Sequence, residues 1–434
     1  MPIFSAAGPI AANGGSADLQ SRLAARASPV AGEASRHHKS ADAATAMPAS
    51  YWLLLAFLFL VYANTPFLLP AAEVLRPAKV VAGLAILALI GETMFGKREL
   101  RFAWPEGGLL IAFLAAAALS CLTALWPGYA AQNVEDLAKM ILTWFFLLNC
   151  ATTERRLRGV MWIMVVGGLF PALGTLKNFL AGNMYEGRAA WVGIFANPNE
   201  VAYALVILVP LAVYLATPRG WWVRLLVSAI LVLFSAAVYV TFSRGGLIAL
   251  AAVIALIGWR KRNKWILGLT AILLAAGSMF ASRYWSRDQD FSQLNGDATV
   301  EQRLATTQAG FDMFLDHPLL GVGFGCSVVA WPLYAPQGVY TRGALVTHNT
   351  FIQALSETGL LGFVPFVGLI GFSLYQMRKL AFGTAATRDP GSAVEVSIWG
   401  LVFCGMSGGY VLTWFPWLLL GLAAAARQIP KEIE

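Results

Sequence analysis

The stretch WVRLLVSAILVLFSAAVYVTFSRGGLIALAAVIALIGW, residues 222–259, decides the class of fold that this chain adopts. It holds two apolar runs, 222–241 and 245–259, separated by a short turn. Each run is close to the roughly 20 residues that an α-helix needs to cross a bilayer. The stretch therefore predicts two adjacent transmembrane helices, with Arg244 at the turn between them.

The rest of the chain repeats this pattern. Of its 434 residues, 58% are hydrophobic and 12% are charged, and the mean hydropathy is +0.65. This composition excludes an ordinary soluble enzyme and indicates an all-α integral membrane protein with about twelve transmembrane helices. The expected spans are 51–69, 79–95, 107–125, 137–150, 159–178, 200–216, 222–241, 245–259, 265–281, 358–377, 394–411 and 412–425.

The distribution of basic residues predicts how these helices are oriented. Residues 1–48 are rich in Ala, Ser and Gly and lack a continuous apolar run, so we expect a disordered cytoplasmic tail. With the N-terminus inside, most Lys and Arg residues fall in inner loops, which satisfies the positive-inside rule. Membrane topology thus explains the basic surplus, without a nucleic acid partner. The expected parts are the tail, helices 1–9 in 49–281, an outer loop 282–357, helices 10–12 in 358–427 and a cytoplasmic end 428–434.

Two arginines do not follow this distribution. Arg188 and Arg244 stand on the outer side, in EGRAAWVGIFANPNE (186–200) and YVTFSRGGLIAL (239–250), beside glycines and aromatic residues. A guanidinium fork matches the oxygens of a phosphate group, so these arginines indicate a bound anion. The alternative is that each side chain only reaches the membrane surface.

The segment GALVTHNTFIQALSETGLLG, residues 343–362, carries the candidate catalytic base. We expect a short helix with Thr347 as its N-cap and His348 in its first turn. The positive end of a helix disfavours protonation, so the imidazole should stay neutral near pH 7. The alternative is that His348 only caps a helix that enters the membrane.

The outer loop around this segment has further recognisable parts. We expect an amphipathic helix from about Val300 to Leu315, closed by Asp316 and His317, followed by a tight glycine loop, DHPLLGVGFG (316–325). Its expected apolar stripe is Leu304, Phe311, Phe314 and Leu315. Aromatic residues that follow it, Trp331, Tyr334 and Tyr340, are suited to stack on sugar faces or to form an interfacial belt.

The loop before the sixth predicted span ends in Asn197, Pro198 and Asn199. Asn199 is expected to cap that helix, and the NPN sequence is then a structural turn. A role in holding sugar hydroxyls is the alternative.

Three of these stretches together resemble one family. GRAAWVGIFANPN, then SRGG at the start of a span, then DHPLLGVGFG and THNTFIQALSETGLLGF in a late outer loop, are similar to the O-antigen ligase and polysaccharide polymerase superfamily of bacterial inner-membrane glycosyltransferases. The resemblance covers about 155–380. It implies a GT-C-like fold and an essential histidine and two essential arginines, which fall on His348, Arg188 and Arg244.

The resemblance also implies the reaction. A glycan passes from undecaprenyl diphosphate to an acceptor sugar hydroxyl at the periplasmic face, with inversion and without a metal or other cofactor. The acceptor is lipid A-core in a ligase or a growing polysaccharide in a polymerase. His348 would accept the hydroxyl proton and the arginines would hold the diphosphate. The expected substrate-binding residues are Arg188, Arg244, Asn197, Asn199, Asn349, Arg303 and Tyr340.

Other classes of membrane protein share this layout. Twelve spans with both termini inside also suit a secondary transporter or a flippase for the same lipid donor. Those proteins usually place ionisable residues near the bilayer midplane, whereas the charges here lie at the span ends. Asp288 and Asp290 have the spelling of a metal-binding Asp-x-Asp motif but lie in a polar stretch, SRDQDFSQLNGD, that we interpret as a solvated turn. Convergence of His348 with the two outer arginines would favour the enzyme.

Overall fold

The computed structural model describes residues 47–64, 76–96, 99–184, 187–217, 220–264, 268, 298–336 and 345–429. Outside these residues lie the predicted cytoplasmic tail except for its last two residues, the ninth predicted span except for Gly268, and also Asp288, Asp290 and Tyr340. The regular elements are helices, as predicted. They are α2 Ala49–Ala63, α5 Pro77–Met94, α6 Glu106–Leu119, α7 Pro127–Cys150, α8 Glu154–Gly167, α9 Leu169–Leu180, α10 Pro198–Ala216, α11 Trp221–Val240, α12 Arg244–Arg260, α14 Ala298–Asp316, α15 Ser327–Tyr334, α16 Thr350–Ala381, α17 Ala385–Gly405 and α18 Trp414–Gln428.

The length and apolar composition of these helices indicate a multi-pass membrane protein. Within the described residues, five helical segments are long and apolar enough to cross a bilayer: α5, the α8–α9 pair, α10, α11 and α16. The apolar helices α2 and α6 are shorter, and α6 continues into a 3-10 turn that ends at Leu122. The structure therefore supports several membrane spans but does not by itself give the expected twelve.

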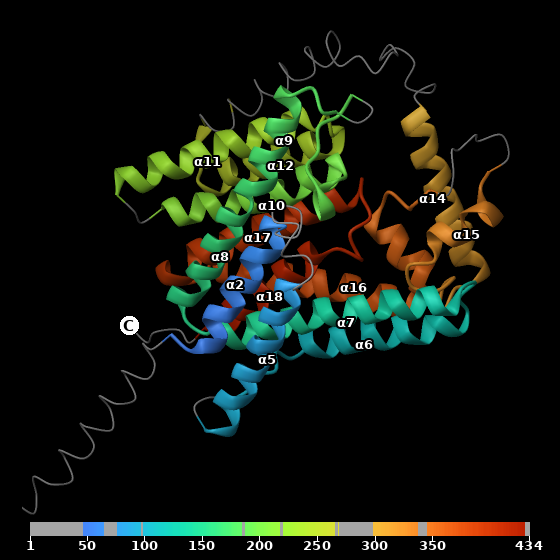
Figure 1. The fold of residues 1–434 in the computed structure, drawn as a ribbon, viewed down its shortest axis with the longest axis horizontal. Coiled ribbons are helices and arrows are strands. Elements are labelled where there is room, and N and C mark those ends of the chain that lie inside the picture. The colour runs from blue at the N-terminus through green and yellow to red at the C-terminus, as the bar shows by residue number, and fades with distance from the viewer. Residues whose placement is uncertain are drawn as a thin grey trace, which may run out of the picture. The chain divides into compact units, whose positions relative to one another are not determined.

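Two helices form the centre of the bundle. Every residue from Val201 to Ala212 of α10 is buried, and so is every residue from Phe415 to Ala426 of α18. Helix α10 packs against α8, α11, α12 and α17, and α18 packs against α7, α16 and α17 (Figure 1). An apolar helix that is buried all round belongs to the interior, since it has no polar face to turn outward.

The termini of four helices, α10, α12, α16 and α17, gather at two opposite ends of the bundle. The starts of α10, α12 and α16 lie with the end of α17, and we call this the histidine end because His348 directly precedes α16 there. The ends of α10, α12 and α16 lie with the start of α17, and we call this the basic end. Helix α10 has 19 residues and spans about 28 Å, close to the thickness of a bilayer core.

The helix predicted from about Val300 to Leu315 is present as α14. Most of the large apolar residues that were expected to form its buried face are exposed. Leu304, Phe311 and Leu315 are 67%, 47% and 58% exposed, whereas the small residue Ala309 is fully buried. A Cβ atom added at Gly310 would lie 2.5 Å from Ile352 of α16, so small residues allow the two helices to approach closely. Close packing between helices, rather than the size of the apolar residues, determines which face is buried.

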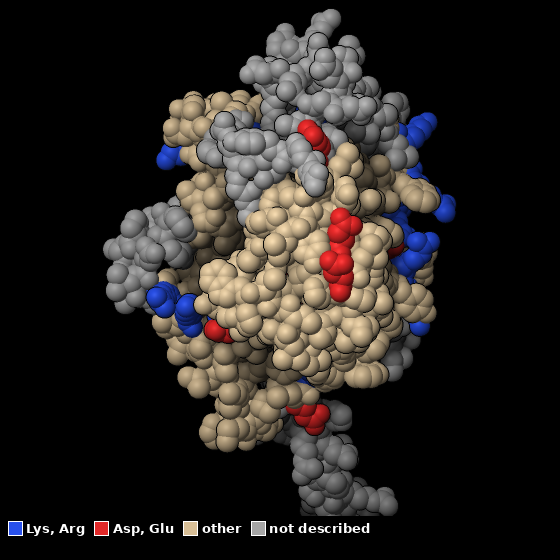
Figure 2. Space-filling model, turned by 90° about the vertical axis from the view of Figure 1, so that its right-hand side faces the viewer, with Lys and Arg blue, Asp and Glu red and all other residues tan. Residues whose placement is uncertain are grey.

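Helices α14 and α15 form one side of the bundle. Figure 2 shows this side as mostly uncharged, with a short acidic strip near its middle and Lys and Arg gathered toward its margins. Trp331 of α15 is 3% exposed and packs in a core with Ala305, Ala309 and Met313 of α14. The prediction that Trp331 stacks on sugars is therefore wrong, because its ring holds α15 against α14.

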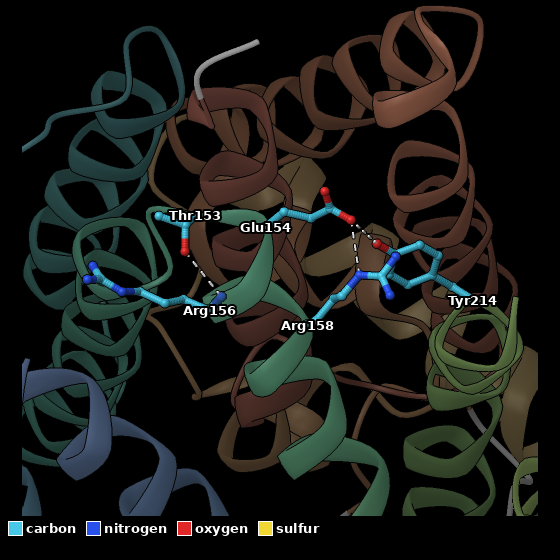
Figure 3. A network of polar contacts seen from close by, with 5 residues as sticks. All are labelled: Thr153, Glu154, Arg156, Arg158 and Tyr214. Atoms are coloured by element: carbon cyan, nitrogen blue, oxygen red, sulfur yellow. Dashed lines mark hydrogen bonds and ion pairs between the residues drawn. The ribbon is translucent and has the colours of Figure 1, made fainter. Parts of the chain in front are cut away.

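A polar network fixes the start of α8 near the basic end. The hydroxyl of Thr153 caps the helix by accepting from the Arg156 backbone N–H at 3.3 Å. Glu154 accepts from Arg158 Nε at 3.0 Å and from the Tyr214 hydroxyl of α10 at 3.3 Å. Figure 3 shows Arg158 pointing toward Tyr214, whereas Arg156 points away from it. The network therefore joins α8 to the end of α10.

Candidate functional site

His348 lies immediately outside α16, not in its first turn. The N-cap of α16 is Asn349, whose side-chain oxygen accepts from the backbone N–H groups of Phe351 at 2.9 Å and Ile352 at 3.2 Å. The prediction that Thr347 caps the helix is wrong, because the asparagine, in an extended conformation, satisfies these first N–H groups itself. His348 is half-buried beside the positive end of α16.

A turn between α17 and α18, Ser407–Tyr410, holds the segment that carries His348; we call it the SGGY turn. The Thr350 hydroxyl donates to the Gly408 carbonyl at 2.6 Å and accepts from the Tyr410 backbone N–H at 3.0 Å. Just before this turn, the Met406 carbonyl accepts from the Asn349 amide at 3.5 Å. Two hydrogen bonds through a buried hydroxyl fix the position of the histidine segment.

The SGGY turn also contacts the start of α12, where Arg244 is the first helical residue. Ser243 caps α12 by accepting from the Gly246 backbone N–H at 3.2 Å. A Cβ atom at Gly245 would lie 2.0 Å from the hydroxyl oxygen of Ser407, so a larger residue here would displace the Ser407 side chain. The half-buried Arg244 and the segment of His348 are thus held by the same turn.

Arg188 joins this group through Asn199. Its Nη2 donates to the Asn199 side-chain oxygen at 2.7 Å, and its Nε donates to the Thr241 carbonyl at 3.0 Å. The same Asn199 oxygen accepts from the hydroxyl of Ser243, the cap of α12, at 2.8 Å. Arg188 therefore lies beside the start of α12.

Asn197, not Asn199, caps α10. Its side-chain oxygen accepts from the Asn199 backbone N–H at 2.9 Å, and Pro198 occupies the first helical position. This leaves the Asn199 side chain available to hold Arg188, whereas Asn197 is exposed. The prediction of Asn199 as the cap is wrong because proline has no N–H, which places the capping residue one position before it.

The charges around His348 favour its neutral form. Burial lowers the pKa of His348 below its ordinary value of 6.5, and the positive charges of Arg303 and Arg188 lower it further. Arg303 belongs to α14, so this helix contributes to the surroundings of His348 together with the starts of α10, α12 and α16. A neutral imidazole is able to accept a proton near pH 7.

The structure thus brings His348, Asn349, Arg303, Arg188, Arg244 and Asn199 to the histidine end of the bundle. His317 is not part of this group by any described contact; its backbone N–H bonds to the Met313 carbonyl at the end of α14. Within the described residues, no group of three or more His, Cys, Asp or Glu side chains is arranged to hold a metal ion.

The SGGY turn and Tyr203 are the parts of the site that sequence reasoning missed. The hydroxyl of Tyr203 in α10 donates to the Ser407 carbonyl at 3.0 Å and lies 2.8 Å from the Ser407 hydroxyl. A signal was available in the sequence, because SGGY interrupts the apolar residues at the end of the expected span 394–411, just before the span 412–425.

Glu357 was also missed. It is 1% exposed on α16 and accepts from the Ser327 hydroxyl at 2.6 Å. No pattern marks it, because the pairing joins residues 30 positions apart.

Comparison with known proteins shows a similarity over the middle of the chain. Residues 229–367 match the family model described as O-antigen ligase. The resemblance to the O-antigen ligase family is confirmed. The match includes Arg244, Arg303 and His348, and it begins after Arg188. Over this segment the chain is therefore similar to glycosyltransferases of the O-antigen ligase and polymerase type.

A curated relative extends the comparison over more of the chain. The chain is 24% identical over 307 residues to the exopolysaccharide production protein ExoQ of Rhizobium meliloti (strain 1021). The alignment covers 65% of this chain and 68% of that protein. The similarity therefore reaches well beyond the segment that the family model matches.

Proposed function

We propose that the chain transfers a glycan from undecaprenyl diphosphate to a sugar hydroxyl, with His348 as the general base. The observation that supports this most directly is the convergence of His348 with Arg188, Arg244 and Arg303 at one end of the bundle. These are a neutral base and three fixed cations, which suit an acceptor hydroxyl and a diphosphate leaving group. The orientation that we propose has both termini in the cytoplasm and the histidine end at the periplasmic face of the inner membrane.

In the proposed reaction the acceptor oxygen attacks the anomeric carbon and its proton passes to His348. The bond between that carbon and the diphosphate oxygen breaks, and the electron pair leaves with the lipid diphosphate. One displacement inverts the configuration at the anomeric carbon. General-base catalysis of this kind contributes roughly 10²- to 10⁴-fold in rate.

The arginines have different parts in this reaction. Arg244 and Arg303 bind the diphosphate and stabilise the charge that develops as the bond to it breaks. Two of the guanidinium nitrogens of Arg188 already donate to Thr241 and Asn199 at 3.0 and 2.7 Å, so Arg188 also fixes the loop before α10. We propose that Asn349, the exposed Asn197 and Tyr340 contact sugar hydroxyls.

Two acceptors are compatible with this chemistry. We put the growing polysaccharide first, because the relative that aligns over 307 residues is an exopolysaccharide production protein. Lipid A-core is the second candidate, because the family description names O-antigen ligase. A transporter or a flippase uses neither a general base nor a leaving group, so the site does not favour those alternatives.

Incubation of the purified protein with a glycan-linked undecaprenyl diphosphate, with and without lipid A-core, separates the acceptors. A ladder of products from the donor alone indicates a polymerase, and a product that needs lipid A-core indicates a ligase. His348→Ala serves as the blank. The absence of any product from the wild-type protein under both conditions would contradict the proposed function.

A further inference from the structure

We propose that the basic end of the bundle binds the phosphate headgroup of an anionic phospholipid in a cavity of about 600 Å³. The cavity lies between α10, α12, α16 and α17, at the ends of these helices that are opposite to His348. Helix α12 has 17 residues and spans about 25 Å, so the cavity lies near the membrane surface opposite to the histidine end. It is therefore separate from the proposed catalytic site.

The charge of the cavity is strongly positive. Five basic side chains line it, Arg260, Lys261, Arg262, Arg378 and Arg388, against two acidic ones, Asp389 and Glu395. Glu395 is 2% exposed in its side chain and is held by both carboxylate oxygens to Arg260. Only Asp389 is left to oppose the other four basic groups, and this surplus favours a phosphate-bearing anion.

The remaining wall of the cavity is apolar and aromatic. The Arg260 and Arg378 guanidinium carbons lie 4.9 and 5.7 Å from the centre of the Phe382 ring. Val213 of α10 and Leu256 of α12 also line the cavity. A cavity lined by both guanidinium groups and apolar side chains fits a lipid, whose headgroup is charged and whose acyl chains are apolar.

The backbone at the end of α12 gives an independent observation. The Arg262 N–H donates to the Trp259 carbonyl at 3.0 Å, and the Asn263 N–H donates to the Gly258 carbonyl at 2.9 Å. This pattern ends a helix with a left-handed residue, most often glycine. Here that residue is Arg262, with φ of 50°. Arginine occupies a backbone conformation that glycine adopts more easily, so we infer that the Arg262 side chain has a binding role that offsets this strain.

The orientation of the protein alone does not explain this arrangement. A cytoplasmic surplus of Lys and Arg requires only that basic residues lie near the span ends. It requires neither a cavity between four helices nor an arginine in a left-handed position. Basic pockets between transmembrane helices are suited to anionic headgroups.

Lipid binding is tested on the purified full-length chain by native mass spectrometry and thermal melting. The probes are phosphatidylglycerol, phosphatidylcholine and inorganic phosphate, each added to delipidated protein in detergent. The variants are Lys261→Gln and Arg262→Gly. Lys379→Gln is the matched control, because Lys379 is an exposed lysine at the end of α16 that does not line the cavity.

We expect phosphatidylglycerol to bind and to raise the melting temperature, with little effect of the other two probes. Each of the two variants should lower the affinity for phosphatidylglycerol about fivefold, and Lys379→Gln should leave it unchanged. Arg262→Gly should melt at the wild-type temperature or higher without lipid, since glycine suits that position, so its loss of lipid is not a folding defect. Equal binding of phosphatidylglycerol and phosphatidylcholine, or unchanged affinity in both variants, would overturn the proposal. Inorganic phosphate that competes at millimolar concentration would assign the cavity to a small anion instead.

Discussion

At the residue scale, the surroundings of His348 determine its chemistry. A histidine in water is half-protonated at its ordinary pKa of 6.5, and a protonated imidazole cannot act as a base. Burial and the charges of Arg303 and Arg188 lower the pKa of His348, so the base is available over a wider range of pH. Arg303, which we assign to the diphosphate, therefore also helps to keep the base neutral.

The pH dependence of kcat/KM tests this relation. The acidic limb of the wild-type profile reports the pKa of His348 in the free enzyme and should lie below pH 6.5, because the folded pKa is lowered. Arg303→Gln removes a positive charge and should move that limb to higher pH, whatever its effect on the maximal rate. Arg224→Gln, at the exposed start of α11, is the control and should leave the limb in place. An unmoved limb in Arg303→Gln would remove this arginine from the surroundings of the base.

Arg244 gives a second prediction at this scale. Arg244→Lys keeps the charge but loses the bidentate fork, so the affinity for the lipid diphosphate donor should fall by about 10- to 100-fold. Arg224→Lys should bind donor as the wild type does. Donor affinity is measured by titration in detergent, and equal affinities for wild type and Arg244→Lys would assign Arg244 to the membrane surface instead.

At the element scale, the glycine loop after α14 docks on α16. Leu360 and Leu361 donate their backbone N–H groups to the carbonyls of Pro318 and Leu319 at 2.8 and 3.2 Å. Gly359 interrupts the helical conformation of α16 with φ of 57° and ψ of −161°, and a Cβ atom there would lie 2.3 Å from the Leu319 carbonyl carbon. The kink therefore needs glycine and allows α14, with Arg303, to be fixed beside the site.

Two glycines of α16 provide a matched test of this docking. Gly359→Ala should destabilise the protein by more than about 1 kcal/mol, because its conformation excludes a side chain and the nearby backbone leaves no room. Gly371→Ala should be neutral or slightly stabilising, since nothing lies within 4 Å of its added Cβ. Thermal melting should show a lower melting temperature for Gly359→Ala than for Gly371→Ala. Equal melting temperatures would contradict the docking of the glycine loop on α16.

The sequence predicts the elements better than the contacts between them. Apolar runs locate most helices because the bilayer sets the length of a transmembrane helix, and the sequence Asp316–His317–Pro318 locates the end of α14. The buried face of α14 was missed because it depends on Gly310 meeting α16 and on Ala309 packing in a core with Trp331 of α15, which no local pattern shows. The SGGY turn was missed as part of the site for the same reason, since its partners are Tyr203 and Thr350.

At the scale of the whole molecule, the bundle separates the two sites that we propose. One end holds His348 and the arginines around it, and the opposite end holds the basic cavity, with the buried helix α10 between them. We propose that the cations at the first end bind a diphosphate, and those at the second end line a cavity together with apolar side chains. This separation agrees with a membrane enzyme that works at one surface and is anchored at the other.

The measurement that tests the central claim most directly compares donor binding with turnover in His348→Ala. Purified protein is titrated with glycan-linked undecaprenyl diphosphate, and release of the free lipid diphosphate is then measured in the presence of acceptor. If His348 is the base, this variant should bind donor with wild-type affinity and lose at least about 100-fold in the rate of transfer. Wild-type turnover in His348→Ala would contradict the mechanism, and loss of donor binding with the fold intact would make His348 a binding residue instead.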